Sequence, residues 1–283
     1  MFITSYQLQV ASYFFMDISI IIVNYKTKGL VRECIKSFKL LKTKVSFEII
    51  VIDNSIDSGL KEILQQRHPD VMYVPLKRNL GLSKGNNIGF SLAKGNYILT
   101  CNSDIMVHEG ALDALHTHLE ENQHVGLVVP RLLHPDGSVQ QSYFRFPSIF
   151  IPALRRLFLG NLPLIKRHLD WFLMKDVEFK GPTPIDWAIE ASWLFRKSLF
   201  DHIGTMDERF FLYLEDTDWC KRIWDAGFHI HYIPHAHMTH LYKRESAQFQ
   251  GLLALRDPLT RIHIISGIKY FCKHWRSAFF FKY

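Results

Sequence analysis

Residues 18–23 read ISIIIV and residues 47–52 read FEIIVI. Both are short, β-branched and almost wholly apolar, which is typical of strands buried on both faces of a parallel sheet. The segment between them predicts a helix, because apolar side chains recur on one stripe: Leu30, Val31, Cys34, Ile35, Phe38 and Leu41. The order strand, helix, strand predicts a βαβ unit at the start of the chain.

The same rhythm continues along the chain. We expect strands over 71–74, 97–100 and 125–129, helices over 83–93 and 111–119, regular structure over 185–195, a helix after Glu215 and a strand over 228–233. The alternation predicts an α/β fold with a mostly parallel central sheet flanked by helices. Such sheets bind ligands beyond the carboxyl ends of their strands, so residues 24–25, 53–55 and 102–104 are the first candidates for a site.

Composition excludes several classes of protein. The chain has 283 residues, of which 48% are apolar and 22% are charged, so it is not disordered over most of its length. It has no run of about 18 apolar residues, which excludes a membrane-spanning bundle. The net charge of +7 favours an anionic partner: nucleotide phosphates, nucleic acid or acidic lipid. Four scattered cysteines without a CxxC pair indicate reduced thiols in a cytosolic protein, and residues 1–16 make a poor signal peptide.

Two stretches depart from the strand–helix rhythm. Residues 140–184 interleave aromatic and leucine side chains with arginine and lysine, and residues 261–283 are again basic and aromatic. Two interpretations of the first stretch stay open. It is either an excursion that packs on the core, or a basic amphipathic surface that rests on a membrane interface or receives a lipid-bearing substrate.

Three polar motifs near expected strand ends also leave alternatives open. Asp53 could bind a base or ribose, or close an Asx-turn. The glycines at 81, 85 and 89 match neither a GxGxxG fingerprint nor a P-loop; they could admit a ligand beside Lys84, or serve a tight turn and close helix packing. Asp104 could cap a helix or hold a divalent metal that bridges two phosphates.

Two later motifs carry acidic and imidazole groups. Three carboxylates within residues 215–218 could complement a helix dipole, and Asp218 could pair with Arg222; alternatively one of them could be a general base with a raised pKa. Histidines at 235, 237 and 240 form HxHxxH, which would suggest zinc, but no cysteine lies close and Pro234 interrupts the pattern. One histidine acting as a single metal ligand is the favoured interpretation.

Taken in order, these motifs resemble glycosyltransferase family 2, in particular its bacterial rhamnosyltransferase-like members. The resemblance covers about residues 17–246. It rests on ISIIIVNYKT at 18–27, DNS at 53–55, the segment 79–89, NSD at 102–104, MDERFFLYLEDTDWCKRIWDAGF at 206–228 and YIPHAHMTH at 232–240.

The resemblance implies a GT-A (Rossmann-like) fold with a helical basic-aromatic insertion and C-terminal tail. Its bounds would be a 1–16 extension, a 17–246 glycosyltransferase domain and a 247–283 helical extension. The domain would divide into a nucleotide-sugar half (17–130) and an acceptor half (131–246). The resemblance also implies roles for individual residues. The base and ribose would be held by Asn24, Tyr25 and Asp53, and the nucleotide-sugar cleft would be lined by Asn79, Lys84, Asn102 and Ser103. The metal would be bound by Asp104 and His240, and the acidic pair would be Glu215 and Asp216, with Asp216 as the base.

Two departures from the family pattern stand out. The metal motif NSD leaves one acidic ligand where some relatives have a second carboxylate. Glu190 replaces a glycine near the acceptor site, which leaves the identity of the acceptor open.

The expected activity is an inverting sugar transfer from a nucleoside-diphosphate sugar to a hydroxyl of a glycan or lipid-linked glycan in cell-surface polysaccharide synthesis. By resemblance, the donor would be dTDP-rhamnose, with UDP-sugars next, and the cofactor Mg²⁺ or Mn²⁺. We expect a cytoplasmic protein with peripheral contact to an anionic membrane on its inner face, and no nucleic-acid partner. The alternatives are a nucleotide-sugar hydrolase and a non-catalytic sugar-binding module; a nicotinamide-dependent oxidoreductase should show GxGxxG, which is absent.

Overall fold

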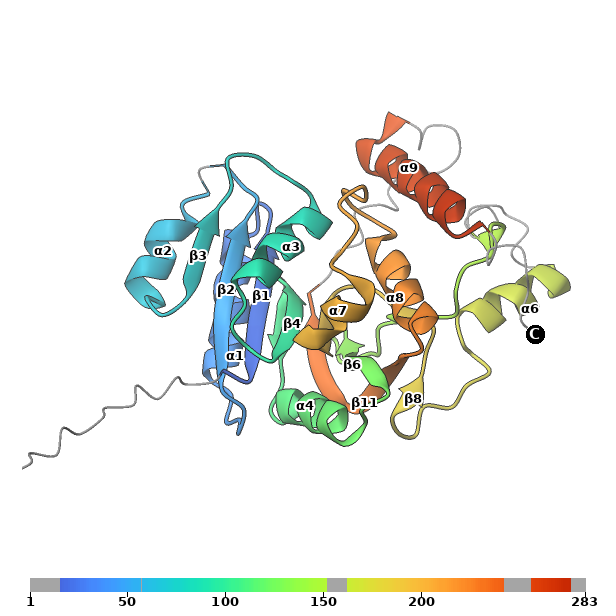
Figure 1. The fold of residues 1–283 in the computed structure, drawn as a ribbon, viewed down its shortest axis with the longest axis horizontal. Helices are drawn as coiled ribbons and strands as arrows, with labels where there is room; N and C mark the ends of the chain where they lie inside the picture. Colours follow the sequence, from blue (N-terminus) through green and yellow to red (C-terminus); the bar gives the residue numbers. More distant parts are fainter. Residues whose placement is uncertain (1–15, 57, 152–161, 242–255, 276–283) are drawn as a thin grey trace, which may run out of the picture.

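The computed structural model describes residues 16–56, 58–151, 162–241 and 256–275. Its centre is a nine-stranded sheet of order β3-β2-β1-β4-β10-β6-β11-β5, with β8 beside β11 (Figure 1). The strands of this sheet are β1 (Ile18–Asn24), β2 (Phe47–Asp53), β3 (Met72–Pro75), β4 (Tyr97–Asn102), β5 (Ile105–Val107), β6 (Val125–Leu133), β8 (Thr183–Pro184), β10 (Ser192–Arg196) and β11 (His229–His240). A separate two-stranded sheet pairs β7 (Tyr143–Phe144) with β9 (Trp187–Ala188).

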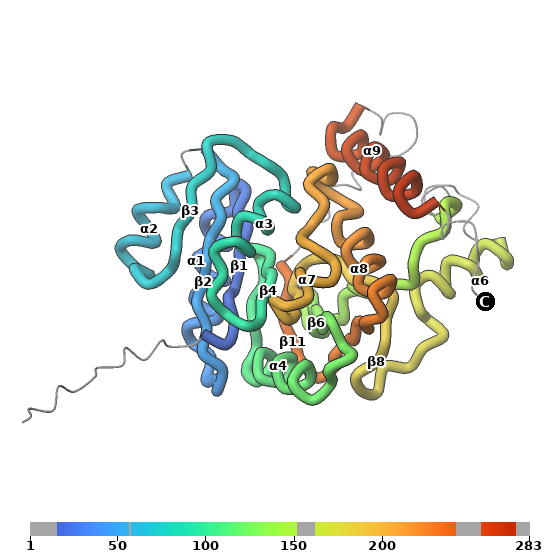
Figure 2. The backbone as a smooth tube through the Cα atoms, viewed as in Figure 1, coloured from blue at the N-terminus to red at the C-terminus, as the bar shows by residue number. Residues whose placement is uncertain are grey.

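The helices lie on both sides of this sheet. They are α1 (Lys28–Lys39), α2 (Leu60–Arg67), α3 (Leu82–Leu92), α4 (Ala111–Glu121), α6 (Pro163–Phe172), α7 (Phe200–Ile203), α8 (Glu215–Asp225) and α9 (Pro258–Lys273). The expected strands and helices are therefore present, and the expected α/β class is confirmed. Figure 2 shows the first strands of the chain, β1 to β4, forming one side of the molecule and the later strands, among them β6 and β11, forming the other.

Strand β1 shows why the sheet has a core on each face. Ile18, Ile20 and Ile22 join the cluster beneath α1, α2 and α4, whereas Ile21 joins the cluster beneath α3 and α8. Successive side chains of a strand point to opposite faces, so a strand buried on both faces must be apolar throughout. The apolar run seen in the sequence is a direct consequence of this three-layer arrangement.

Strand β10 runs against its neighbours in the middle of the sheet. It is antiparallel to both β4 and β6, whereas β1, β2, β3 and β4 are parallel to one another and β6 is parallel to β11. The carboxyl ends of the parallel strands and the amino end of β10 therefore meet at one edge. That edge collects Asn24, Asp53, Asn102, Glu190 and His240.

Each of the two basic-aromatic stretches contains a helix within its described part. Helix α6 lies in the first and α9 in the second, and in Figure 1 both lie on the same side of the molecule. Residues 1–15, 152–161, 242–255 and 276–283 lie outside the described residues, so the expected extension 1–16 and parts of the insertion and tail are not described. No helix among the described residues is both long and apolar enough to cross a membrane.

The cysteines are free thiols, as the sequence predicts. Cys34, Cys101 and Cys220 are buried and Cys272 is exposed.

Candidate active site

Asp53 is buried at the end of β2 and is surrounded by hydrogen-bond donors. Asn24 Nδ2 donates to its Oδ1 over 2.8 Å, and the Tyr73 hydroxyl donates to its Oδ2 over 2.9 Å. The Ser55 N–H donates to Oδ1 over 3.0 Å and the Ser58 hydroxyl to Oδ2. Burial alone would raise the pKa of Asp53, but these donors together hold it below its ordinary value. Asp53 is therefore a fixed anion at neutral pH.

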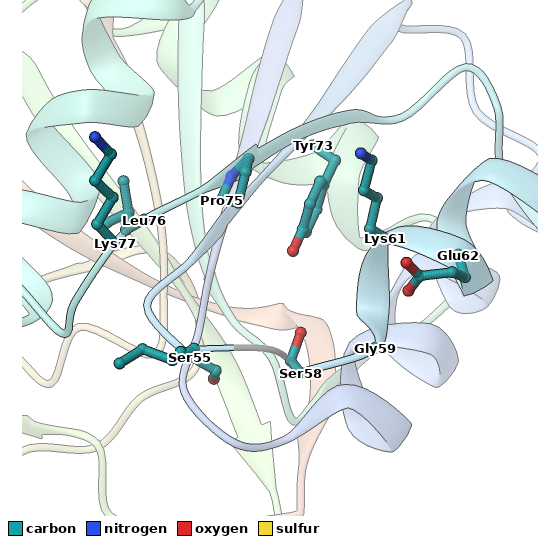
Figure 3. A pocket seen from close by; sticks show the side chains of 10 residues that line it. Ser55, Ser58, Gly59, Lys61, Glu62, Tyr73, Pro75, Leu76 and Lys77 are labelled. Carbon is teal, nitrogen blue, oxygen red and sulfur yellow. The ribbon is translucent and has the colours of Figure 1, made fainter.

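A pocket of about 270 Å³ opens beside this carboxylate (Figure 3). It lies at the ends of β2 and β3. Ser58 and Tyr73, whose hydroxyls donate to Asp53, both line it. Burial and the Asp53 carboxylate raise the pKa of Tyr73 to about 12, so its hydroxyl keeps its proton and remains a donor. The Asx-turn at Asp53 is also present, since Ser55 N–H bonds to its side chain. The turn and the polar pocket thus occur together.

The glycines of the segment 79–89 serve close packing. A Cβ atom on Gly81 would lie 2.4 Å from the Phe211 carbonyl oxygen, and one on Gly89 would lie 2.4 Å from Ile21 Cγ2. Gly81 also has φ +85°, a conformation that side chains disfavour. Asn79 accepts from the Gly81 N–H, and the half-exposed Lys84 pairs with Glu208 over 3.0 Å. The packing interpretation of these glycines is supported.

Asp104 and His240 lie against each other, although 136 residues separate them in sequence. His240 Nε2 is 3.3 Å from Asp104 Oδ1, because β11 pairs with β5 directly after the Asp104 turn. On the other side of the ring, Nδ1 lies 3.0 Å from Gln140 Oε1. An amide oxygen can only accept, so Nδ1 carries a proton, and the other ring nitrogen, Nε2, faces the carboxylate.

This arrangement fits a divalent cation. A carboxylate oxygen and an imidazole nitrogen, Asp104 Oδ1 and His240 Nε2, face each other over 3.3 Å, and both are atom types that bind divalent cations. Gln140 accepts a hydrogen bond from His240 Nδ1. A histidine that binds metal through one ring nitrogen usually has its other ring nitrogen hydrogen-bonded in this way. The structure therefore brings together the two residues expected to bind metal.

Helix α8 begins with the acidic run. Tyr213 and Leu214, just before it, have φ of +69° and +65°. Two consecutive left-handed residues store strain of about 1–3 kcal/mol each, which surrounding contacts must hold. The loop is held by the Leu82 N–H and the Ser83 hydroxyl at the start of α3, which donate to the carbonyls of residues 211 and 210. The Ser266 hydroxyl of α9 donates to the carbonyl of residue 212.

Of the three carboxylates in this run, Asp218 is structural. It is fully buried and contacts Arg222, Lys273 and His274 at 3.1, 2.7 and 2.8 Å. Burial would raise the pKa of Asp218, but these cationic and donor groups hold it below its ordinary value. The expected Asp218–Arg222 pair is confirmed, and two residues at the end of α9 complete it.

The other two carboxylates, Glu215 and Asp216, lie beside a third, Glu190. Burial raises the pKa of Asp216 to about 6, and the backbone N–H groups of Thr217 and Glu190 partly offset this. Thr217 donates to Asp216 Oδ1 through both its N–H (2.6 Å) and its hydroxyl (3.1 Å). Burial, together with the Asp216 charge, raises the pKa of Glu190 to about 8 and that of Glu215 well above its ordinary value.

Glu190 is the residue whose surroundings sequence reasoning missed. Its Oε1 accepts from Asn86 Nδ2 over 3.0 Å, whereas its buried Oε2 has no hydrogen-bond partner, and neither does Glu215 Oε2. The only signal in the sequence was that Glu190 replaces a glycine. Burial of the Cys101 thiol raises its pKa, the neighbouring Cys34 raises it further, and the charges of Asp104 and Glu190 add to this.

The remaining expected residues lie at the same edge. Ser103 Oγ is 2.7 Å from Thr27 Oγ1, and the Asn102 N–H donates to the carbonyl of residue 191 over 2.9 Å. Tyr25 is exposed, with the Lys26 ammonium over its ring.

Comparison with known proteins assigns the chain to a family. The model of glycosyl transferase family 2 matches residues 19–204. The chain belongs to this family.

Its relatives include an N-acetylglucosaminyl-diphospho-decaprenol L-rhamnosyltransferase of Mycobacterium tuberculosis, 28% identical over 71% of this chain and 68% of that protein. They also include the dTDP-rhamnosyl transferase RfbF of Shigella flexneri, 26% identical over 76% of this chain and 67% of that protein. Among solved structures, GalNAc-T7 with UDP, GalNAc and Mn²⁺ shares 17% identity at a TM-score of 0.63, over 84% of this chain and 45% of that one. The expected GT-A fold and rhamnosyltransferase-like family are confirmed.

Proposed function

We propose that this glycosyltransferase moves a sugar, rhamnose by first choice, from a nucleoside-diphosphate sugar to a hydroxyl of a glycan or lipid-linked glycan, with inversion. The observation that carries the proposal is the carboxylate cluster of Glu190, Glu215 and Asp216 at the edge of the sheet that also holds Asp53 and Asp104. The names of the relatives support a dTDP-rhamnose donor and a diphospho-lipid acceptor.

In this proposal Asp216 is the base. A pKa of about 6 leaves it ionised at neutral pH yet basic enough to take a proton from the acceptor hydroxyl. The alkoxide-like oxygen then attacks the anomeric carbon, and the bond to the diphosphate breaks on the opposite face. Glu190, with a pKa of about 8, remains protonated beside it, so that one anion rather than three occupies the cluster near pH 7.

At the other end of the breaking bond, Asp104 and His240 would hold Mg²⁺ or Mn²⁺. When bound, this cation neutralises the charge that grows on the leaving diphosphate. The imidazole ligand favours Mn²⁺. Asp53, with its ring of donors, would hold the ribose or base at the pocket of Figure 3, and Asn24, Tyr25, Asn79, Lys84, Asn102 and Ser103 would complete the donor site.

The test begins with donor binding. A thermal-shift panel of dTDP, UDP and GDP, each with Mn²⁺, Mg²⁺ or EDTA, should show stabilisation by dTDP that depends on the cation. Incubation with labelled dTDP-rhamnose and a lipid-linked acceptor extract should then transfer label to lipid, and an acceptor-free reaction separates transfer from hydrolysis. Absence of stabilisation by every nucleoside diphosphate would remove the proposal.

We further propose that the side of the molecule bearing α6 and α9 rests on an anionic membrane. Leu164 on α6 and Ile268 on α9 are exposed by 82% and 59%, and Lys166 and Arg167 lie exposed beside the former. Apolar side chains flanked by basic ones suit the interface of an anionic bilayer. Flotation with anionic liposomes should recover the chain at low salt and lose it at high salt, whereas neutral liposomes should not bind it.

A further inference from the structure

Four histidines gather at the edge of the sheet opposite the carboxylates. His229 and His231 lie two residues apart at the start of β11, so their side chains share one face of the strand. His124 directly precedes β6, which runs parallel to β11 and pairs with it from Val125 onward. His118 lies in the last turn of α4. Parallel pairing of β6 and β11 therefore brings three segments of the chain to one place.

Three of these histidines could share one ion. One ring nitrogen from each of His124, His229 and His231 lies within 4.8 Å of the other two. The rings of His124 and His229 are in edge contact at 5.2 Å, and the His229 N–H donates to the His124 carbonyl over 2.9 Å. Trp224 stacks on the His229 ring at 4.9 Å and limits its rotation. The backbone hydrogen bond and the Trp224 ring thus hold His124 and His229 close together.

His231 has the environment of a ligand. It is only 9% exposed, and its Nε2 is buried without a hydrogen-bond partner. Its Nδ1 lies 3.0 Å from His118 Nε2. If Nδ1 donates to His118, the free lone pair of His231 lies on Nε2. A ligating histidine typically has its second nitrogen held in this way.

We propose that His124, His229 and His231 bind one Zn²⁺ ion, with His118 orienting His231 from behind. Three imidazoles and a solvent molecule satisfy the tetrahedral preference of zinc, and the exposed His124 leaves the fourth position open to water. Nitrogens around tetrahedral zinc lie about 3.4 Å apart, given Zn–N bonds of about 2.0–2.1 Å. The three ring nitrogens, which lie within 4.8 Å of one another, would approach to this spacing when the ion binds.

This site is distinct from the Asp104–His240 pair. His231 and His240 lie towards opposite ends of β11: His231 pairs with Val128 of β6 and Thr239 with Leu133, five residues further along, which corresponds to about 17 Å of strand. The HxHxxH pattern noted in the sequence does not form it, because His235 is exposed, His237 contacts the Pro234 carbonyl and His240 contacts Asp104. The role of the ion would be structural: it would join the loop before β6 to β11, with α4 behind.

The experiment uses the full chain without a polyhistidine tag, after treatment with a chelator and dialysis. Titration calorimetry with Zn²⁺ should show a site that persists in Asp104→Asn, in which the Asp104–His240 pair is disrupted, and Co²⁺ should give the visible spectrum of a four-coordinate ion. Zn²⁺ should also raise the melting temperature. Either failure of the chain to bind Zn²⁺ or a single site that disappears in Asp104→Asn overturns the proposal.

Matched variants separate the cluster from other histidines. His124 is exposed and precedes a strand, so His124→Ala should leave the fold intact while it weakens Zn²⁺ binding at least about 100-fold. His118→Ala should weaken Zn²⁺ binding about 10–100-fold. His134→Ala, in a turn outside the cluster, should bind like the parent. Equal binding by His124→Ala and His134→Ala overturns the assignment, even if the chain binds zinc elsewhere.

Discussion

Asp53 and Asp216 stand at the same edge of the sheet, yet their surroundings act on them in opposite directions. Asp53 receives hydrogen bonds from four residues, and they outweigh burial, so its pKa falls. Asp216 receives hydrogen bonds from Thr217, from the Glu190 backbone and from its own backbone, but desolvation beside two other carboxyl groups outweighs them and raises its pKa to about 6. The balance between desolvation and hydrogen bonding, rather than the number of donors, therefore decides whether a carboxylate is a permanent anion suited to binding or a proton acceptor suited to chemistry.

The largest effect is expected where the proton acceptor is removed. Asp216→Asn should lower the rate of transfer by about 10³-fold or more, because a general base typically contributes about 10²–10⁴-fold. Binding of nucleoside diphosphate should stay within twofold, as calorimetry would show. In the parent, activity should fall below about pH 6 as Asp216 gains a proton.

Asp225→Asn is the control, since it removes a carboxylate from the exposed end of the same helix. Near-normal turnover of Asp216→Asn would contradict the assignment of the base.

On the binding side, Asp53→Asn should chiefly raise the KM for the donor, by about tenfold, with a smaller change in kcat. An amide places a donor where the hydroxyls of Ser58 and Tyr73 already donate, so urea unfolding should also show a loss of about 1–3 kcal/mol. Tyr73→Phe removes one donor only and should cost about 1 kcal/mol. If Asp53→Asn lowers kcat and leaves KM unchanged, the division between binding and chemistry is wrong.

The third prediction concerns stability and pH. Glu190 has a pKa of about 8 in the folded chain, so between its ordinary value and pH 8 the folded state holds a proton that the unfolded state has lost. The stability of the parent therefore falls as the pH rises through this window. Glu190→Gln has no such proton and can still accept from Asn86, so its free energy of unfolding, measured by urea denaturation, should fall less between pH 5 and 8 than that of the parent, by on the order of a few kcal/mol.

Glu208→Gln is the matched control for this pH dependence. Hydrogen bonds from Lys84 and Asn87 hold the pKa of Glu208 below its ordinary value. The stability of Glu208→Gln should therefore fall with rising pH as much as that of the parent. Parallel curves for the parent and Glu190→Gln would show that Glu190 is ionised throughout this window.

The smallest effect is expected at Lys84. Its ion pair with Glu208 is half-exposed, so Lys84→Met should change stability by less than about 1 kcal/mol. Because Lys84 is proposed to face the diphosphate, the KM for the donor should rise several-fold at low salt and less at high salt. An unchanged KM in kinetic assays at both ionic strengths would remove Lys84 from the donor site.

Much of this architecture was predictable from local sequence. The runs at 18–23 and 47–52 can only be strands buried on both faces, and the polar residues that follow them, Asn24 and Asp53, must then meet at one edge of a parallel sheet. Asp104 and the acidic run at 215–218 were identified in the same way. The family resemblance extended this to His240, which the structure places against Asp104.

What local sequence could not determine depends on the direction and pairing of distant strands. Glu190 reaches the carboxylate cluster only because β10 is inserted antiparallel, which turns its amino end toward the carboxyl ends of its neighbours. The proposed zinc site depends on the parallel pairing of β6 and β11. This pairing brings His124 and His229 together, although more than a hundred residues separate them in sequence. The periodicity of a sequence shows which face of a strand is buried, whereas the order and direction of the strands follow from the packing of the whole core. The sequence therefore determined which residues could take part in a site, and the tertiary structure determined which of them lie together.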